Sequence, residues 1–159
     1  MKKYSEILFS ILVCLIFIVG CTTKFVNESG KQLPPGLGFA VQVVEQANIL
    51  YDSVMTSAGK MHCDGKITDD VAWKIIKAGR TYKLAVDTLR VAISQWKAAV
   101  ENKTDTESTK YQTYLSILGL TKEAALLVED YNKLTGKEVK IPSILTTDTL
   151  EQVFGGIYK

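Results

Sequence analysis

The sequence predicts an all-α fold, an elongated antiparallel three-helix bundle with a short helical C-terminal tail. Apolar residues recur at steps of three and four over three long segments, which is the spacing of one helix face. Only three prolines occur, two of them adjacent, and no strand-like alternation competes with the helical spacing. The connections at 62–67 and 102–104 are short, so neighbouring helices are expected to run antiparallel.

The first helix is expected from Leu37 to Met61. Gly65 follows it and suits the left-handed turn that often ends a helix. The predicted buried face is Ala40, Val44, Ala47, Tyr51, Val54, Ala58 and Met61.

The second helix is expected from Thr68 to Glu101. Thr68 can cap its first turn, where Asp69 and Asp70 lie favourably near the positive end of the helix dipole. The predicted buried face is Val71, Ile75, Ala78, Tyr82, Ala85, Leu89, Ala92, Trp96 and Ala99, widened by Ala72, Ile76, Val86, Ile93 and Val100.

The third helix is expected from Asp105 to Leu134 and is ended by Gly136. The apolar segment 139–145 is expected to pack on the bundle before a last short helix, Thr149 to Phe154, which Thr147 or Asp148 can start. The predicted buried face of the third helix is Tyr114, Ile117, Leu120 or Thr121, Ala124, Leu127, Tyr131 and Leu134.

The amino terminus has the pattern of an export signal. Lys2 and Lys3 precede an apolar run, Ile7 to Gly20, of about 14 residues, whereas a helix needs roughly 20 to cross the bilayer core. An uncleaved anchor helix is the alternative. The domain organisation that follows is a signal peptide over 1–20, a cysteine and tether over 21–36, a bundle over 37–136 and a tail over 137–159.

The run ends in Ile18-Val19-Gly20-Cys21, which resembles the lipobox of bacterial lipoproteins. The resemblance covers the first 21 residues and implies a diacylglyceryl group on the Cys21 sulfur, with cleavage before Cys21. It also implies a membrane as a partner, through that lipid, and a location in the cell envelope. Thr22 stands where an Asp often marks inner-membrane retention, which favours the periplasmic face of the outer membrane in a Gram-negative cell.

The charge balance and the motifs exclude several classes of function. Without Lys2, Lys3 and Glu6 the chain keeps 17 basic and 16 acidic residues, so it has no electrostatic footprint for nucleic acid. His62 is the sole histidine, and its neighbours Cys63 and Asp64 fall short of a four-ligand zinc site. No nucleophile elbow, phosphate loop or nucleotide fingerprint occurs. We therefore expect no catalytic residues, no metal and no cofactor, and a protein that is not an enzyme.

Two residues are candidates for an interface. Cys63 is the one cysteine left once Cys14 is removed with the signal and Cys21 carries lipid, so a disulfide would have to join two chains. Trp73 lies off the main apolar face of its helix, and exposed aromatic residues are enriched at interfaces.

These observations favour a membrane-tethered envelope component that binds another, unknown envelope protein or has a structural role, with homo-oligomers as a further expectation. The alternative is a small-molecule or lipid binding module held between the helices. A closed core with an exposed apolar strip would favour a protein partner, and a solvent-open apolar cavity would favour a ligand.

The last residues are Tyr158 and Lys159, after Gly155 and Gly156. This ending is similar to that of the major wall-linked outer-membrane lipoproteins. That resemblance, limited to the two ends of the chain, implies a peptidoglycan linkage through the Lys159 side chain.

Overall fold

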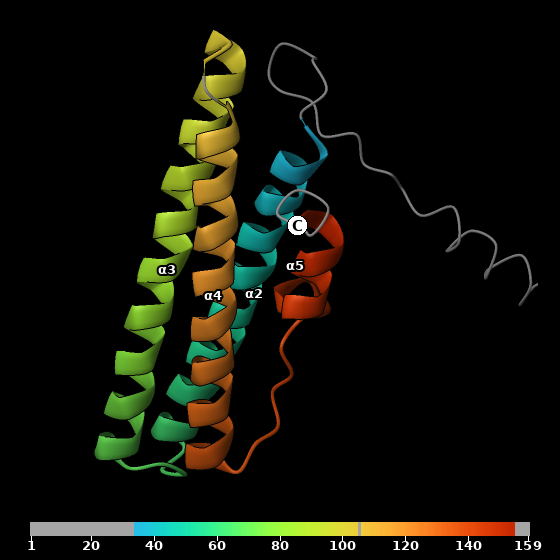
Figure 1. Cartoon of the computed structure of the whole chain (residues 1–159). Helices are drawn as coiled ribbons and strands as arrows, with labels where there is room; N and C mark the ends of the chain where they lie inside the picture. The colour runs from blue at the N-terminus through green and yellow to red at the C-terminus, as the bar shows by residue number, and fades with distance from the viewer. Residues whose placement is uncertain (1–33, 105, 155–159) are drawn as a thin grey trace, which may run out of the picture. The chain divides into compact units, whose positions relative to one another are not determined.

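The computed structural model describes residues 34–104 and 106–154, and within them every regular element is helical and no strand occurs (Figure 1). The all-α prediction is therefore confirmed for this part of the chain. The export signal, Cys21 and most of the tether, like Lys159 at the other end, lie outside the described residues.

Helix α2 spans Pro35–Cys63 and begins two residues before the predicted start. Pro35 is tolerated there because its fixed φ suits the first helical position and its missing N–H would have had no helical acceptor. The helix ends at Cys63, and Gly65 forms the predicted left-handed turn after it, with a φ of +67°. The Lys66 amide then donates to the Met61 carbonyl at 2.8 Å, which satisfies an exposed carbonyl of the last turn.

Helix α3 spans Asp69–Asn102, with Thr68 as its N-cap. The Thr68 hydroxyl oxygen accepts a hydrogen bond from the Val71 amide at 3.4 Å, so the predicted cap is confirmed. The helix ends at Lys103, whose φ of 54° lies in the left-handed region.

Helix α4 spans Thr106–Thr135 and ends at Gly136, which has a φ of +66°. The chain then turns back, because the Asn132 side chain bonds both the amide and the carbonyl of Val139, at 2.8 and 3.0 Å. A short 3-10 helix η1, Ser143–Leu145, leads into helix α5, Thr147–Phe154. The tail helix therefore starts two residues earlier than predicted.

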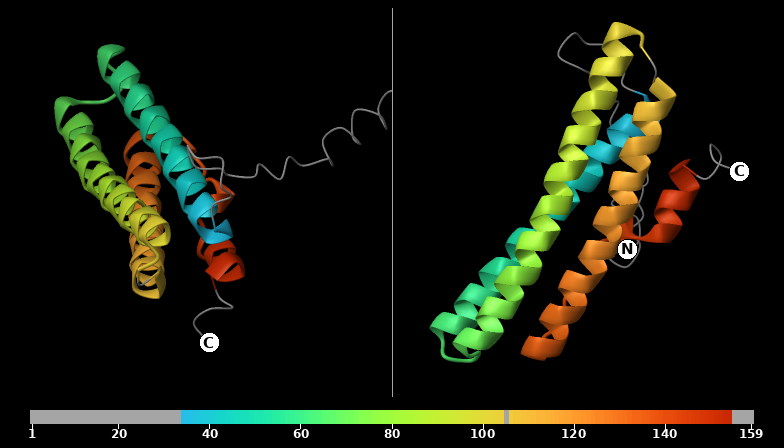
Figure 2. Two further views of the ribbon diagram at one scale, coloured as in Figure 1. Left: turned by 90° about the horizontal axis from the view of Figure 1, so that it is seen from above. Right: turned by 60° about the vertical axis from the view of Figure 1, so that its left-hand side comes forward.

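Helix α3 packs against both α2 and α4, and α4 also contacts α5 (Figures 1 and 2). The tail is fastened by Phe154, which is fully buried. Its ring lies 6.0 Å from that of Phe39 in α2 and 5.5 Å from that of Tyr114 in α4, measured between centroids. The short helix therefore joins α2 and α4.

The predicted buried faces are correct along most of their length but are displaced by one residue in places. Val43 and Leu50 are buried, whereas Val44 and Tyr51 are partly exposed. The predicted Val71, Ala78, Ala85, Tyr114 and Leu134 are also only partly buried. Gly79, which was not predicted, lies in the core of α3 instead of Ala78, and Val86, from the predicted widening of the face, lies there instead of Ala85.

The displacement at Gly79 has a steric cause. A Cβ atom added there would lie 2.8 Å from the Sδ atom of Met55 and 3.4 Å from the Tyr51 ring. Side chains of helix α2 thus lie close to the backbone of α3 at the residue without a side chain. That close approach rotates the buried face of α3 toward Gly79.

Candidate interaction surface

The seam between α2 and α3 is closed by a buried tyrosine. Tyr82 of α3 is fully buried, and its hydroxyl donates to the Ala47 carbonyl of α2 at 3.0 Å. Burial raises the pKa of this phenol well above its ordinary value, because the charged phenolate would be desolvated. The Tyr82 ring also stacks on that of Tyr51, with centroids 6.4 Å apart.

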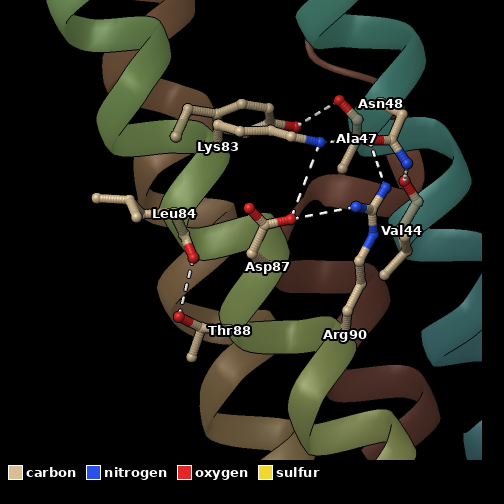
Figure 3. A network of polar contacts seen from close by, with 9 residues as sticks. Val44, Ala47, Asn48, Lys83, Leu84, Asp87, Thr88 and Arg90 are labelled. Atoms are coloured by element: carbon tan, nitrogen blue, oxygen red, sulfur yellow. Dashed lines mark hydrogen bonds and ion pairs between the residues drawn. The ribbon is translucent and has the colours of Figure 1, made fainter.

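A polar network runs along the outside of the same seam (Figure 3). The Asn48 side-chain oxygen accepts hydrogen bonds from Lys83 Nζ at 3.3 Å and from Arg90 Nη2 at 3.0 Å. Asp87 lies between the two cations, 3.1 Å from Arg90 and 3.9 Å from Lys83. These groups are half exposed, so each pair contributes little to stability. Their effect is positional, since they hold the charges of mid-α3 on the side of α2.

The opposite side of mid-α3 carries no charge. Figure 3 shows Leu84 pointing away from the Asn48 network, and its side chain is 68% exposed. Val91 lies two turns further along the helix and is 58% exposed. The neighbouring helix is similar, since residues 111–121 of α4 contain no Asp, Glu, Lys, Arg or His.

These side chains form what we name the α3–α4 strip. It consists of four aliphatic residues that are each 40–68% exposed: Leu84, Val91, Leu115 and Leu126. Leu118 is also 37% exposed, but it lies at the edge of α4 that faces the tail and is not counted in the strip. Single exposed leucines are ordinary, whereas four such aliphatic side chains on two adjacent helices indicate a candidate interaction site.

A shallow hollow between α3 and α4 is lined partly by small residues and partly by Leu115, Leu120 and Glu123. The hollow has a volume of about 350 Å³ and is lined by Ala85, Thr88, Leu115, Ser116, Gly119, Leu120 and Glu123. A Cβ added at Gly119 would meet nothing within 4 Å, so this glycine leaves open space. Ridges of leucine and valine flanking a floor of small residues are what an incoming helix needs for ridge-into-groove packing.

The strip continues into a charged end between the start of α3 and the end of α4. A second hollow of about 450 Å³ lies there and is lined by Lys74, Lys77, Ala78, Thr81, Glu123, Leu126, Leu127, Asp130, Lys133 and Leu134. The lysines at 74 and 77 come from α3, and the carboxylates at 123 and 130 come from α4. Lys74 pairs with Asp70 at 2.6 Å, whereas neither Lys77 nor Asp130 forms an ion pair with another described residue.

The two interface candidates from the sequence lie elsewhere. Trp73 is 55% exposed in the first turns of α3, and the Arg80 guanidinium carbon lies 5.2 Å from its ring centroid. Such stacking of a cation on an aromatic face accounts for an exposed indole without a partner protein. The role of Trp73 in an interface remains a prediction.

Cys63 is a free, exposed thiol at the last residue of α2. Next to it, His62 Nε2 lies 2.7 Å from Asp69 Oδ1 across the α2–α3 turn, with the carboxylate almost fully exposed. Within the described ranges no cluster of three or more His, Cys, Asp or Glu side chains is placed to hold a metal.

The sequence prediction missed the α3–α4 strip and the Asn48 network. A signal for part of the strip was present, because Leu84 and Val91 lie seven residues apart and off the predicted buried face of their helix. The uncharged segment 111–121 was a second signal. The Asn48 network joins residues 35 and 42 positions apart, and no local pattern indicates such a pairing.

Comparison with protein families, with curated proteins and with solved structures finds no match for this chain. Among the helices of residues 34–154 that the structure describes, none is long and apolar enough to cross a membrane.

Proposed function

We propose that the chain is a bacterial lipoprotein, lipidated at Cys21, whose helical part is a non-enzymatic protein-interaction component of the cell envelope. The observation that carries the lipoprotein proposal is the lipobox-like Ile18-Val19-Gly20-Cys21 at the end of a short apolar run. The residue after the cysteine, Thr22, favours the periplasmic face of the outer membrane where the cell has one.

Metabolic labelling tests the lipid anchor. Cells that express the full chain are grown with a labelled fatty acid, and the label on the native protein is compared with that on Cys21→Ala. The matched controls are Cys14→Ala and Cys63→Ala, which remove the other two cysteines. We expect the label to be lost in Cys21→Ala alone. Equal labelling of Cys21→Ala and the native protein would exclude lipidation at this residue.

For the architecture we propose the elongated antiparallel three-helix bundle. Its support is the pairing of late residues of α2 with early residues of α3 and late residues of α4. Gly79 lies against Met55, and the Ser57 hydroxyl lies 2.6 Å from that of Tyr131. Spin labels at Lys60 and Lys133 should then be close. Labels at Lys60 and Glu107 should be farther apart by roughly 40 Å, the rise of 26 helical residues.

The α3–α4 strip carries the interaction part of the proposal. The core side chains of α3 and α4 are buried between the helices, at 0–1% exposure for Tyr82, Leu89, Ile117 and Leu127. Leu84 and Val91, by contrast, are exposed to solvent. A photo-reactive amino acid at position 84 should give an adduct in intact cells. The matched control is Ile49 of α2, which is 58% exposed but lies outside the strip. Equal adducts from positions 84 and 49, or none from either, would contradict a specific interface at the strip.

The alternative is a binding module for a small molecule or lipid. The observation that favours it is the hollow of about 450 Å³, where Leu126 and Leu134 lie near three lysines that would suit an anionic head group. A fluorescent fatty acid distinguishes the two functions. Saturable binding to the chain that Leu126→Glu abolishes and Ile49→Glu leaves unchanged would favour the ligand.

Wall linkage through Lys159 is a separate proposal that rests on the resemblance of residues 155–159 to the wall-linked outer-membrane lipoproteins. Cell walls are boiled in detergent, digested with lysozyme and examined for this protein attached to wall fragments. Linkage predicts attached native protein and none after deletion of Lys159. Complete extraction of the native protein by detergent would exclude it.

A further inference from the structure

We propose that the α3–α4 strip binds a second copy of the same chain. The two copies would meet face to face across a two-fold axis that runs along the helices. Each α3 would then pack against α4 of the other copy, so that four helices surround the joined strips. This inference deepens the proposed function by naming the partner, and it rests on that function only in treating the strip as an interface.

The apolar part of the surface suits a helical partner of the same kind. The hollows place 74–81 of α3 beside 123–134 of α4, and 85–88 beside 115–123. Along the axis of α3, the side chains of the strip therefore occur in the order Leu126, Leu84, Leu115 and Val91. Together they span the length of about 12 residues of α3, or roughly 18 Å of helix. Each copy offers both ridges, on α3 and α4, and a floor of small residues. A face of this kind is self-complementary, as a two-fold interface requires.

The charges beside the strip select the second copy and its orientation. Residues 70–81 of α3 hold three cations, Lys74, Lys77 and Arg80, against one carboxylate, Asp70. Residues 122–134 of α4 hold three carboxylates against two cations. The two segments lie at the same end of the strip, on its two sides. An axis along the helices brings the basic segment of one copy opposite the acidic segment of the other.

Other arrangements lack this match. If the axis instead lay across the helices, α3 would face α3 of the second copy, and the basic segment would lie opposite residues near Gln95, where the nearest charged side chain is another cation, Lys97. On α3, the charges nearest the middle of the strip are held on the α2 side, because Asn48 binds Arg90 and Arg90 pairs with Asp87. On α4, Glu123 lines the hollow. Charge complementarity at an interface sets the partner and its register.

The first experiment uses full-length chains that carry two different tags and are expressed together in one bacterial host. With the photo-reactive amino acid at position 84, the adduct should have twice the mass of the chain and contain both tags. Native copies should also co-purify in detergent, and Leu84→Glu should weaken this association by at least about tenfold, since it would bury a charge without a partner. The control Ile49→Glu should leave co-purification unchanged.

The second experiment exchanges charges at Lys77 and Asp130. In the proposed dimer, Lys77→Glu places like charges opposite each other twice, and so does Asp130→Lys. Each variant should therefore associate with itself less than the native chain does. When one copy carries Lys77→Glu and the other Asp130→Lys, both contacts become attractive, and association should return toward the native level.

The outcomes separate the two proposals. An adduct of another mass at position 84 refutes self-association but keeps the strip as an interface, whereas no strip-specific adduct refutes both. Failure of the mixed charge pair to recover association refutes the parallel arrangement, because an attraction within one chain could not be restored by mixing. Circular dichroism of each variant verifies that the helices remain folded.

Discussion

Two leucines five residues apart on α3 provide a test of the fold. Leu89 is completely buried, whereas Leu84 is 68% exposed. Substitution by alanine removes the same atoms from the same helix in both cases, so differences in helix propensity cancel. Leu89→Ala should lower the free energy of unfolding by about 2–5 kcal/mol, from lost burial and the cavity left behind. Leu84→Ala should change it by less than about 0.5 kcal/mol, as other surface substitutions do.

Urea unfolding followed by circular dichroism measures the difference on a fragment of residues 34–159. With a slope of about 1.5 kcal/mol per molar urea, a loss of about 3 kcal/mol lowers the midpoint by about 2 M. The protein is kept dilute, and two concentrations are compared, so that dissociation of a dimer does not enter the Leu84 value. A loss below about 1 kcal/mol for Leu89→Ala, or equal losses for both variants, would refute the assignment of Leu89 to the core.

Three further outcomes are expected. Tyr82→Phe should cost about 1 kcal/mol at neutral pH, because it removes the hydrogen bond to the buried Ala47 carbonyl. Because the pKa of Tyr82 is raised in the folded protein, this side chain contributes fully to the free energy of unfolding below about pH 10, the pKa of an unfolded tyrosine. The contribution is lost progressively as the pH rises above that value. The native protein should therefore lose more stability between pH 9 and 11 than the Phe variant, and parallel urea curves would contradict this. Cys63→Ser should leave the melting temperature of the reduced protein nearly unchanged, because the thiol is exposed; a large decrease would show that the thiol is packed. Phe154→Ala should cost about 3–5 kcal/mol in urea unfolding, and a negligible cost would mean that α5 does not fasten the tail.

The helices and their ends were predictable because their signals are local. Thr68 accepts a bond from an amide three residues away, and Gly65 and Gly136 adopt the positive φ that glycine allows at little cost. The tail helix was also expected, with Thr147 or Asp148 as its starting residue, although the predicted helical span began only at Thr149. Each of these features depends on residues within one or two turns, so a single sequence contains the information.

The buried faces were only partly predictable, since α3 packs on two neighbours at once. A helix covered on two sides has a wide apolar face, and several residue sets with the same spacing fit it equally well. A close contact between two helices helps to decide among them. Here it is Gly79 against Met55, and a pattern that ranks residues by hydrophobicity gives glycine no weight.

The α3–α4 strip could not be located from the sequence because it depends on which helices are adjacent. Leu84 and Val91 become a surface only beside Leu115 and Leu126 of the next helix. The Asn48 network depends in the same way on the pairing of α2 with α3.

The contacts of α3 with α2 and with α4 differ in whether the side chains outside the core take part in the fold. Toward α2, α3 contributes Tyr82 and the partly exposed charges that Asn48 binds, and these contacts close the seam to other molecules. Toward α4, buried side chains such as Leu89 and Ile117 close the core, and the aliphatic side chains outside them contribute little to it. Polar substitutions at Leu84 should therefore be tolerated by the fold, whereas exposed apolar area is costly in water unless a partner covers it. The side chains that the fold can spare are those on which the proposed contact between copies depends.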